Sequence, residues 1–199
     1  MLLPFQPRRI AEAWIVPADV SFCAAVYPTV PFSHLDAPSL TVLGVLLSNA
    51  YLHRVIREQG GAYGSGAGQD NDQAAFRFFS YRDPRIEGTF SDFDRAVAWI
   101  IDQAPAPRDV EEAILGVIGS LDKPGSPAGE ARQTYYDALH GRSPEARQAY
   151  RAAVLQVSAS DLQRVAATYL KPELVSRAVL TGERNAATCA DMGFEVMGG

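Results

Sequence analysis

The sequence contains few of the residues from which self-contained catalytic sites are most often built. It has only two cysteines, Cys23 and Cys189, and three histidines, His34, His53 and His140. Two cysteines so far apart do not form a disulfide framework, so a reducing compartment or the lack of a redox role is the simplest interpretation. The histidines form neither a His-x-x-Glu-His motif nor its inverted form, and a catalytic zinc usually needs three protein ligands. We therefore expect no metal site and no catalytic residue in this chain.

Positive charge and long apolar runs are also scarce. The formal net charge is −5, and the 18 basic residues are scattered along the chain, which gives no support for a nucleic-acid or anionic-membrane partner. The longest apolar run, from Val42 to Leu47, is too short to span a bilayer. The first residues lack the order of charged and apolar residues found in a signal peptide. We therefore expect neither nucleic acid nor a membrane as a partner.

The glycine-rich stretch at residues 60–68 does not complete a known catalytic or phosphate-binding motif. Gly64-Ser65-Gly66 follows a helix and enters a strand, which is the reverse of a nucleophile elbow. The stretch has no Gly-Lys-Ser/Thr ending and no strand that leads it into a helix. The aromatic run at residues 76–81 lacks the glycines of an RNA-binding sheet. Core packing is the better explanation of that run.

Hydrophobic periodicity predicts an α+β fold in which the strands are separated from most of the helices along the chain. The expected strands cover residues 12–20, 21–30, 61–68, 74–81 and 174–181, with residues 194–196 as an edge strand. A helix that is apolar almost all round covers about residues 39–59, so we expect it to be buried. This order predicts a largely antiparallel sheet with helices packed on one face. At 199 residues with 47% apolar content, one domain spanning residues 1–199 fits best.

Capping patterns predict where the later helices begin. The expected starts are the pairs Ser91/Asp94, Asp109/Glu112 and Ser160/Gln163, together with the prolines Pro127 and Pro144. A Ser or Asp followed three residues later by an acid or amide is typical of a capping box, and proline is favoured at the first helical position.

The stretch from His53 to Pro84 carries the functional signal. Gly60 and Gly61 end the long helix, and Tyr63 follows within the glycine-rich turn. On the simpler interpretation, Arg57 complements the carbonyl end of the helix and Tyr63 is a half-buried strand aromatic. Alternatively, the glycines expose the backbone on both sides of Tyr63, so that an extended peptide could add to this strand. Arg57 and the Tyr63 hydroxyl would then donate to its carbonyl oxygens.

Three segments resemble a known family: REQGGAYG at residues 57–64, FRFFSYRDP at residues 76–84 and EAWIVP at residues 12–17. Together with the helix around Phe93 and Trp99, they resemble the C-terminal half of presequence protease-like zinc metallopeptidases of the pitrilysin/insulinase family. After Asp109 the likeness is one of helical pattern more than of motif. The resemblance covers the whole chain as one of four homologous domains, of which this chain is similar to the last.

The resemblance implies a function that this chain performs only together with others. In the family, two halves close around a chamber, and the zinc and its His-x-x-Glu-His motif lie in the first domain. The second half contributes an arginine and a tyrosine, six or seven residues apart, that bind the substrate near the scissile bond. Arg57 and Tyr63 match these two residues, and Gly60 and Gly61 would shape the turn between them. The implied partners are the N-terminal peptidase domains, in the same chain or in a separate subunit, and a peptide substrate.

Because the zinc motif is missing, we do not expect the chain to hydrolyse peptides alone. Two other interpretations stay open: a catalytically inactive structural or partner subunit of the same fold, and a stand-alone peptide-binding module. The abrupt start favours a piece excised from a longer chain. The low lysine and high alanine and arginine content indicates a GC-rich bacterium, so we expect a bacterial cytoplasm, with an organellar matrix as the alternative.

Overall fold

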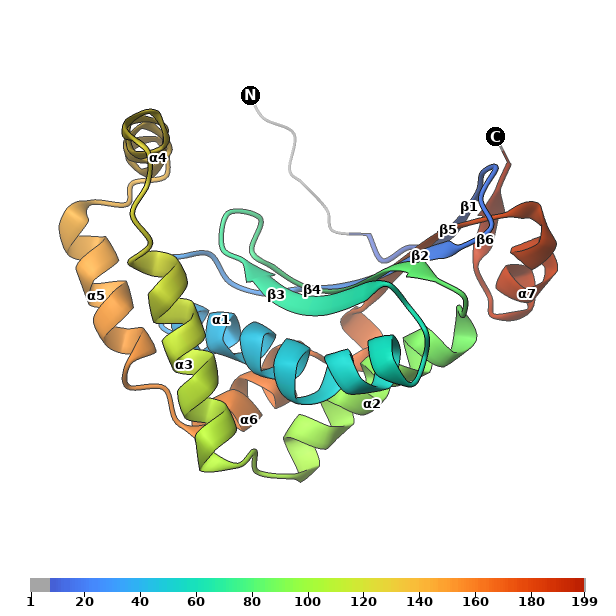
Figure 1. The fold of residues 1–199 in the computed structure, drawn as a ribbon, viewed down its shortest axis with the longest axis horizontal. Helices are drawn as coiled ribbons and strands as arrows, with labels where there is room; N and C mark the ends of the chain where they lie inside the picture. Colours follow the sequence, from blue (N-terminus) through green and yellow to red (C-terminus); the bar gives the residue numbers. More distant parts are fainter. Residues whose placement is uncertain (1–7, 199) are drawn as a thin grey trace.

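The strands form one six-stranded sheet in the computed structural model, which describes residues 8–198 (Figure 1). The strands are β1 (Ala11–Ile15), β2 (Ser21–Pro28), β3 (Gly64–Asp70), β4 (Ala75–Asp83), β5 (Ser176–Thr181) and β6 (Glu195–Met197). Their order across the sheet is β3-β4-β2-β5-β1-β6. The pairs β3–β4, β4–β2 and β2–β5 are antiparallel, and β5–β1 and β1–β6 are parallel. The prediction of a largely antiparallel sheet is confirmed, with parallel pairing confined to the β1–β6 end.

Helices cover one face of this sheet. The helices of the described residues are α1 (Ala37–Leu46), η1 (Leu47–Glu58), α2 (Glu87–Asp102), α3 (Pro107–Leu121), α4 (Pro127–Leu139), α5 (Pro144–Val154), α6 (Ala159–Tyr169) and α7 (Ala186–Asp191). Short 3₁₀ turns occupy Pro172–Leu174 and Glu183–Asn185. In Figure 1, α1, α2, α3 and α6 lie below the sheet, α4 stands apart at the upper left, and α7 lies beside β6. This arrangement confirms the predicted α+β architecture.

Period-two alternation in the strands separates the buried and exposed faces of the sheet. In β4, Phe76 and Phe78 are fully buried, whereas Phe79 and Tyr81 are more than a third exposed. The ring of Phe78 packs 5.4 Å from that of Phe93 in α2. Complete burial of one such side chain contributes about 1.5–3 kcal/mol to the free energy of folding. The aromatic strand therefore anchors the helical layer, as the sequence predicted.

The long helix predicted at residues 39–59 is two helices of different winding. α1 is a regular helix, and η1 continues it as a π-helix up to Glu58. Together, residues 37–58 are long and apolar enough to cross a membrane by length and composition, which the short apolar run did not indicate. Leu40, Leu43, Leu52 and Ile56 are completely buried in the core, so core packing accounts for this apolar character.

Several predicted helix starts were wrong by a few residues. Pro127 and Pro144 do begin α4 and α5, after the N-cap serines Ser126 and Ser143. The three capping boxes fail, because α2 already begins at Glu87, α3 at Pro107, and α6 has its box at Ser158 and Asp161. Proline at position 107 is preorganised for a helix start and moves that start ahead of the acidic residue.

Candidate functional site

The exposed C-terminal end of η1 brings together three polar side chains. Arg57 Nη1 lies 3.1 Å from His53 Nε2, and His53 Nδ1 lies 3.3 Å from Glu58 Oε1. A π-helix closes hydrogen bonds between residues five apart, so residues four and five apart share one face. His53 therefore lies between a cation and an anion, which regular α-helical winding would not produce.

The two predicted glycines form a tight turn after this helix. Gly61 has a φ of +81°, in the left-handed region that only glycine adopts easily. Its N–H donates to the carbonyl oxygen of Arg57 at 3.1 Å, and the N–H of Ala62 donates to that of Ile56 at 3.1 Å. This turn reverses the chain, so that Tyr63 follows the end of η1 and immediately precedes β3.

The turn is supported from below by a charged cluster. A Cβ on Gly60 would overlap the guanidinium group of Arg85 and would lie 2.6 Å from the carbonyl oxygen of Ile56. Arg85 Nη2 lies 3.1 Å from Asp92 Oδ2, and the Arg85 N–H donates to Asp83 Oδ1 at 3.0 Å. Asp83 is completely buried. Glycine at position 60 therefore allows the turn to rest directly on a buried ion-pair cluster.

Tyr63 presents most of its side chain to solvent, with 64% of its surface exposed. Its N–H donates to the carbonyl oxygen of Arg82 at 3.3 Å, and its ring lies 5.6 Å from that of Tyr81. The guanidinium carbon of Arg82 lies 5.8 Å from the Tyr63 ring. Arg82 itself has a φ of +49°, a conformation that non-glycine residues rarely adopt and that is often found at functional sites. Tyr81 and Arg82 thus contact the ring of Tyr63, while most of its side chain stays accessible to solvent.

The glycines of β3 admit neighbouring groups from the protein itself. A Cβ on Gly66 would lie 2.9 Å from the Phe79 ring, and one on Gly64 would overlap the Tyr81 ring. The outward N–H of Ala67 donates to Ser48 Oγ at 2.8 Å. The glycine pattern suggested that a peptide strand could add on both sides of Tyr63. At Ala67, an added strand would have to displace the Ser48 hydroxyl.

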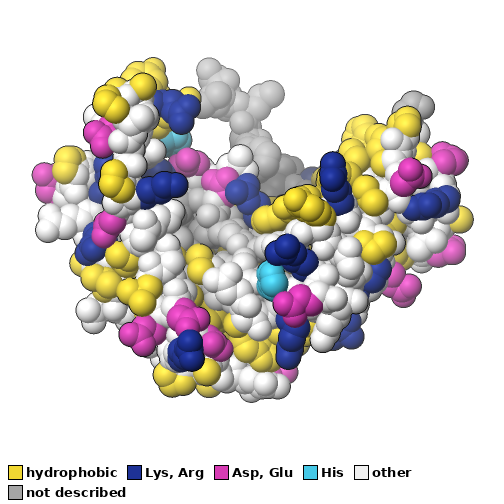
Figure 2. Space-filling model, in the orientation of Figure 1, with side chains coloured by type: hydrophobic (Ala, Val, Ile, Leu, Met, Phe, Trp, Pro, Cys, Tyr) yellow, Lys and Arg dark blue, Asp and Glu magenta, His cyan; other side chains and the backbone are white. Residues whose placement is uncertain are grey.

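The face of the sheet opposite the helices carries a continuous apolar row. Phe22, Leu180, Trp14 and Met197 are neighbours across β2, β5, β1 and β6. The first three are 39%, 40% and 47% exposed. Figure 2 shows hydrophobic side chains gathered over the β1–β6 end of the molecule, next to Lys and Arg side chains. Exposed apolar patches of this kind are typical of interaction surfaces.

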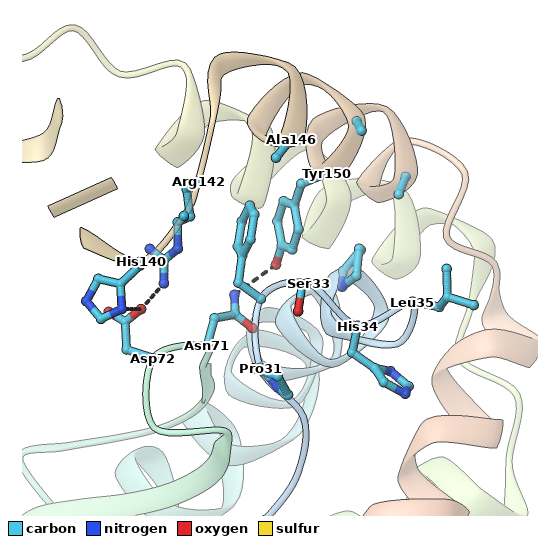
Figure 3. A pocket seen from close by; sticks show the side chains of 15 residues that line it. Pro31, Ser33, His34, Leu35, Asn71, Asp72, His140, Arg142, Ala146 and Tyr150 are labelled. Atoms are coloured by element: carbon cyan, nitrogen blue, oxygen red, sulfur yellow. Dashed lines mark hydrogen bonds and ion pairs between the residues drawn. The ribbon is translucent and has the colours of Figure 1, made fainter. Parts of the chain in front are cut away.

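A cavity lies elsewhere, between α5, the loop at residues 31–35 and the tip of the β3–β4 hairpin (Figure 3). Its volume is about 430 Å³. The Phe32 and Tyr150 rings stack at 4.6 Å, and the Arg142 guanidinium lies 4.8 Å from the Phe32 ring. In Figure 3, His140 and Arg142 both approach Asp72. The Arg142 guanidinium is already paired with the Asp72 carboxylate. It is therefore not available to bind an anionic ligand in this cavity.

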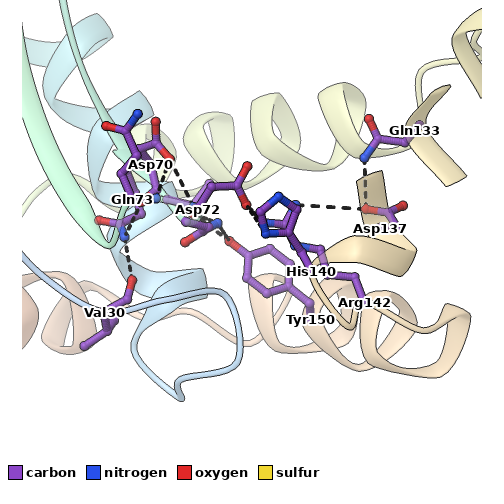
Figure 4. Close-up of polar contacts among 12 residues, drawn as sticks. Val30, Asp70, Asp72, Gln73, Gln133, Asp137, His140, Arg142 and Tyr150 are labelled. Carbon is purple, nitrogen blue, oxygen red and sulfur yellow. Dashed lines mark hydrogen bonds and ion pairs between the residues drawn. The ribbon is translucent and has the colours of Figure 1, made fainter. Parts of the chain in front are cut away.

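Polar contacts around this cavity attach α5 to the hairpin tip (Figure 4). Arg142 forms an ion pair with Asp72, and Asn71 Nδ2 donates to the Tyr150 hydroxyl at 3.1 Å. The buried Asp137 accepts from Gln133 Nε2 at 3.0 Å. These contacts explain how the projecting α4–α5 pair is held, and we assign them a structural role.

Among residues 8–198, the cysteines are buried and the potential metal-binding side chains do not gather into a metal site. Cys23 and Cys189 are both buried and free. Burial raises the pKa of the Cys23 thiol to about 12, so it stays protonated and unreactive. Within this described part of the chain no three His, Cys, Asp or Glu side chains gather as metal ligands. The described residues therefore provide no set of ligands that fits a zinc ion.

Comparison with protein families gives a match over most of the chain. Residues 11–180 match the model described as the PreP C-terminal domain. The chain is 38% identical over 169 residues to a mitochondrial presequence protease of Emericella nidulans, covering 85% of this chain and 16% of that protein. For its counterpart in Danio rerio the identity is 36% over 166 residues, covering 83% and 16%. The chain thus spans about a sixth of the length of these relatives.

Solved structures show the same fold at low sequence identity. A protease from Helicobacter pylori superimposes with a TM-score of 0.74 at 16% identity, covering 88% of this chain and 45% of that one. A peptidase M16 inactive domain from Pseudomonas fluorescens gives a TM-score of 0.72 at 13% identity, covering 92% and 46%. Both likenesses support the fold, and neither places a substrate or a metal in this chain.

Proposed function

Since the chain belongs to the family of presequence protease C-terminal domains, we propose that it works as the non-zinc-binding, substrate-contacting domain of a longer zinc metallopeptidase. In this proposal it closes the substrate chamber and binds a peptide through Arg57 and Tyr63. The observation that carries the proposal is the turn at Gly60 and Gly61, which presents both exposed side chains at the same end of the sheet. The shared fold and the family match support it.

The chemistry of the two side chains suits a peptide backbone. Arg57 offers several N–H donors, and the Tyr63 hydroxyl can donate one hydrogen bond. Peptide carbonyl oxygens accept such bonds and gain negative charge in the transition state of hydrolysis, when donors aimed at them act most strongly. A zinc ion bound by another domain would supply the activated water. The residues of this chain would bind and orient the peptide.

The partners in this proposal are the N-terminal peptidase domains of the same enzyme. The apolar row of Phe22, Leu180 and Trp14 supports this, because it offers a surface on the side of the sheet that the helices leave open. The relatives are about six times as long as the matched segment, which leaves ample chain for such domains. The relatives are mitochondrial presequence proteases, which supports an organellar matrix. The bacterial cytoplasm that composition favoured stays a prediction.

A second candidate function is a catalytically inactive structural domain. The similar domain from Pseudomonas fluorescens is described as inactive, and residues 8–198 contain no cluster of metal ligands. The two candidates make different demands on Tyr63. An inactive domain needs only the fold, whereas a substrate-contacting domain needs the hydroxyl group.

The test is a pair of tyrosine substitutions in the full-length zinc-loaded protein that contains this chain. We expect Tyr63→Phe to lower kcat/KM for an unfolded peptide by about 10²–10³-fold, as for loss of one transition-state donor. Tyr135→Phe on α4 is a matched control, since Tyr135 is also 64% exposed, and should leave kcat/KM unchanged. Equal activity of the two variants would refute the assignment of Tyr63. Complete absence of peptide cleavage in the parent protein would favour the inactive structural domain.

A further inference from the structure

The imidazole of His53 links the two charged side chains at the end of η1. Its Nε2 lies 3.1 Å from Arg57 Nη1, and its Nδ1 lies 3.3 Å from Glu58 Oε1. The exposed fractions of the His53 and Glu58 side chains are 48% and 60%. All three residues belong to one helix, so their spacing is set by the winding of η1 alone.

Hydrogen-bond chemistry fixes which ring nitrogen carries the proton. A guanidinium group has only donors, so Nε2 of His53 must accept the hydrogen bond from Arg57. A neutral imidazole that accepts at Nε2 carries its hydrogen on Nδ1. Nδ1 lies 3.3 Å from Glu58 Oε1, an ion-pair distance at which the ionised carboxylate attracts the hydrogen on Nδ1. The contacts therefore run in one direction, from Arg57 to His53 and from His53 to Glu58.

We propose that His53 is a positioning residue, which holds the Arg57 guanidinium ready for the peptide and is itself oriented by Glu58. This inference rests on the proposed substrate-binding role of Arg57. One N–H of Arg57 is used by the imidazole, and within residues 8–198 no acceptor engages the remaining N–H groups, which can donate to peptide oxygens. A held side chain loses less rotational freedom when a ligand binds. His53 itself contacts no substrate in this proposal.

The π-helical winding of η1 is what brings the Glu58 carboxylate next to the His53 ring. In a regular α-helix, residues three and four apart are neighbours, whereas residues five apart lie on different faces. His53 and Glu58 are five apart, so Glu58 can orient the ring only while η1 keeps its π winding. π-Helical winding is rare, and the π turns that occur within α-helices are frequently found at functional sites. The winding thus connects the Glu58 carboxylate, through the His53 ring, to Arg57, which binds the peptide in this proposal.

A double-mutant cycle in the full-length zinc-loaded protein tests this chain of contacts. We expect His53→Leu to lower kcat/KM for a peptide about 3- to 10-fold, the size of one ordinary net hydrogen bond. His53→Gln keeps an acceptor and a donor and should restore kcat/KM to within about 2-fold. In an Arg57→Ala background, His53→Leu should have no further effect, because His53 acts through Arg57.

The outcomes separate this inference from the proposed function. If Arg57→Ala leaves kcat/KM unchanged, the substrate-binding role of Arg57 fails and the positioning role falls with it. If Arg57→Ala lowers kcat/KM but His53→Leu has the same effect in both backgrounds, only the role of His53 is overturned. A His53→Leu variant with parental kcat/KM overturns it as well. Equal thermal unfolding midpoints of parent and variants are required, so that a loss of folding is not read as a loss of positioning.

The tautomer gives a readout that does not depend on activity. Nitrogen NMR of the full-length protein labelled in histidine distinguishes a ring protonated on Nδ1 from one protonated on Nε2, and the signal that disappears in the His53→Gln variant is that of His53. We expect His53 to carry its proton on Nδ1, and Arg57→Ala to release that preference. A ring protonated on Nε2 in the parent protein would overturn the proposed direction of the contacts.

Discussion

The guanidinium group of Arg85 occupies the space that a side chain on Gly60 would need. Gly60 lies in the turn between Arg57 and Tyr63, and Arg85 is held by Asp83 and Asp92. The turn that presents the candidate substrate-binding residues is therefore built on a buried ion-pair cluster. This relationship makes the position sensitive to the smallest added side chain.

Replacing Gly60 by alanine should destabilise the protein. The new Cβ would meet Arg85 and would lie 2.6 Å from the Ile56 carbonyl oxygen, which cannot move without opening the turn. We expect the free energy of unfolding to fall by about 1–3 kcal/mol, as for overpacking of a close-packed site. Urea unfolding of both proteins measures this difference.

A glycine with free space around it is the matched control. Gly119 lies in α3, and a Cβ there would meet no atom within 4 Å. Gly119→Ala should raise the free energy of unfolding by about 0.5–1 kcal/mol, because alanine loses less backbone entropy in a helix. If Gly60→Ala were as stable as Gly119→Ala, Arg85 would move aside without cost and the proposed support would not exist.

Loss of the Ser48 hydroxyl should weaken the edge of the sheet. Ser48 Oγ accepts from the Ala67 N–H at 2.8 Å, and its proton lies within reach of the Gly44 carbonyl oxygen at 2.7 Å. Ser48→Ala leaves the Ala67 N–H without this partner, which should cost about 1–3 kcal/mol. Ser65→Ala is the comparison, because its contact with the Leu52 carbonyl oxygen is longer, at 3.4 Å. Equal losses in the two variants would show that Ser48 has no special role at this edge.

An unprotected edge should also change how the protein associates. Free N–H groups on an edge strand pair readily with strands of other molecules. Ser48→Ala should therefore form oligomers at lower protein concentration than the parent, which light scattering measures. Monomeric behaviour identical to that of the parent would show that the packing of η1 against β3 is enough to protect the edge.

The strands and the buried face of the sheet could be predicted because both depend on local period-two patterns. Core packing was predicted for the aromatic run at residues 76–81, and within it Phe76 and Phe78 are completely buried, whereas Tyr81 lies on the more exposed face. The helix starts were less predictable, since Ser91 and Asp109 look like caps but lie within helices that begin earlier. A proline or the packing of the helix can set the helix start ahead of a capping pattern. Residue spacing alone does not reveal which of these determines the start.

The candidate site was predictable only in part. Arg57 and Tyr63 were found through a resemblance, and their substrate-binding role stays a prediction. The contact between His53 and Glu58 could not be foreseen, because a helical pattern is read with regular α-helical winding, which places them on different faces. The support from Arg85 joins residues that are distant in sequence, and nothing in the local pattern near Gly60 indicates it.

The attachment of α1 to α6 should depend on pH. Asp36 Oδ2 accepts from the Tyr169 hydroxyl at 2.7 Å, and Asp36 Oδ1 lies 2.8 Å from Arg164 Nη1. Burial raises the pKa of the Asp36 carboxyl, but the hydrogen bonds from Tyr169 and Arg164 outweigh burial and hold the pKa below its usual range. The folded state therefore favours ionised Asp36. Its contribution to stability is present above the unfolded pKa of about 3.9 and is lost as the pH falls through the lower folded value.

Substitution of Asp36 by asparagine removes this pH dependence. At pH 7, Asp36→Asn should lower the free energy of unfolding by about 1 kcal/mol, the difference between a charge-assisted and a neutral hydrogen bond. As the pH falls below about 4 and then through the lower folded pKa of Asp36, the parent carboxyl becomes protonated, so the stabilities of the two proteins should converge. Urea unfolding between pH 3 and pH 7 measures the difference. A gap that stays constant over this range would show that the ionisation of Asp36 does not contribute to stability.

The tyrosine of the same contact gives the opposite pH dependence. Burial, together with the hydrogen bond to the Asp36 carboxylate, raises the pKa of Tyr169 to about 12. Because the folded state favours the protonated hydroxyl, its contribution is fully present below the unfolded pKa of about 10 and is lost as the pH rises towards 12. Tyr169→Phe should therefore be less stable than the parent at pH 8, and this difference should shrink above pH 10. An unchanged difference in alkaline urea unfolding would contradict the role of the hydroxyl and leave only ring packing to join the two helices.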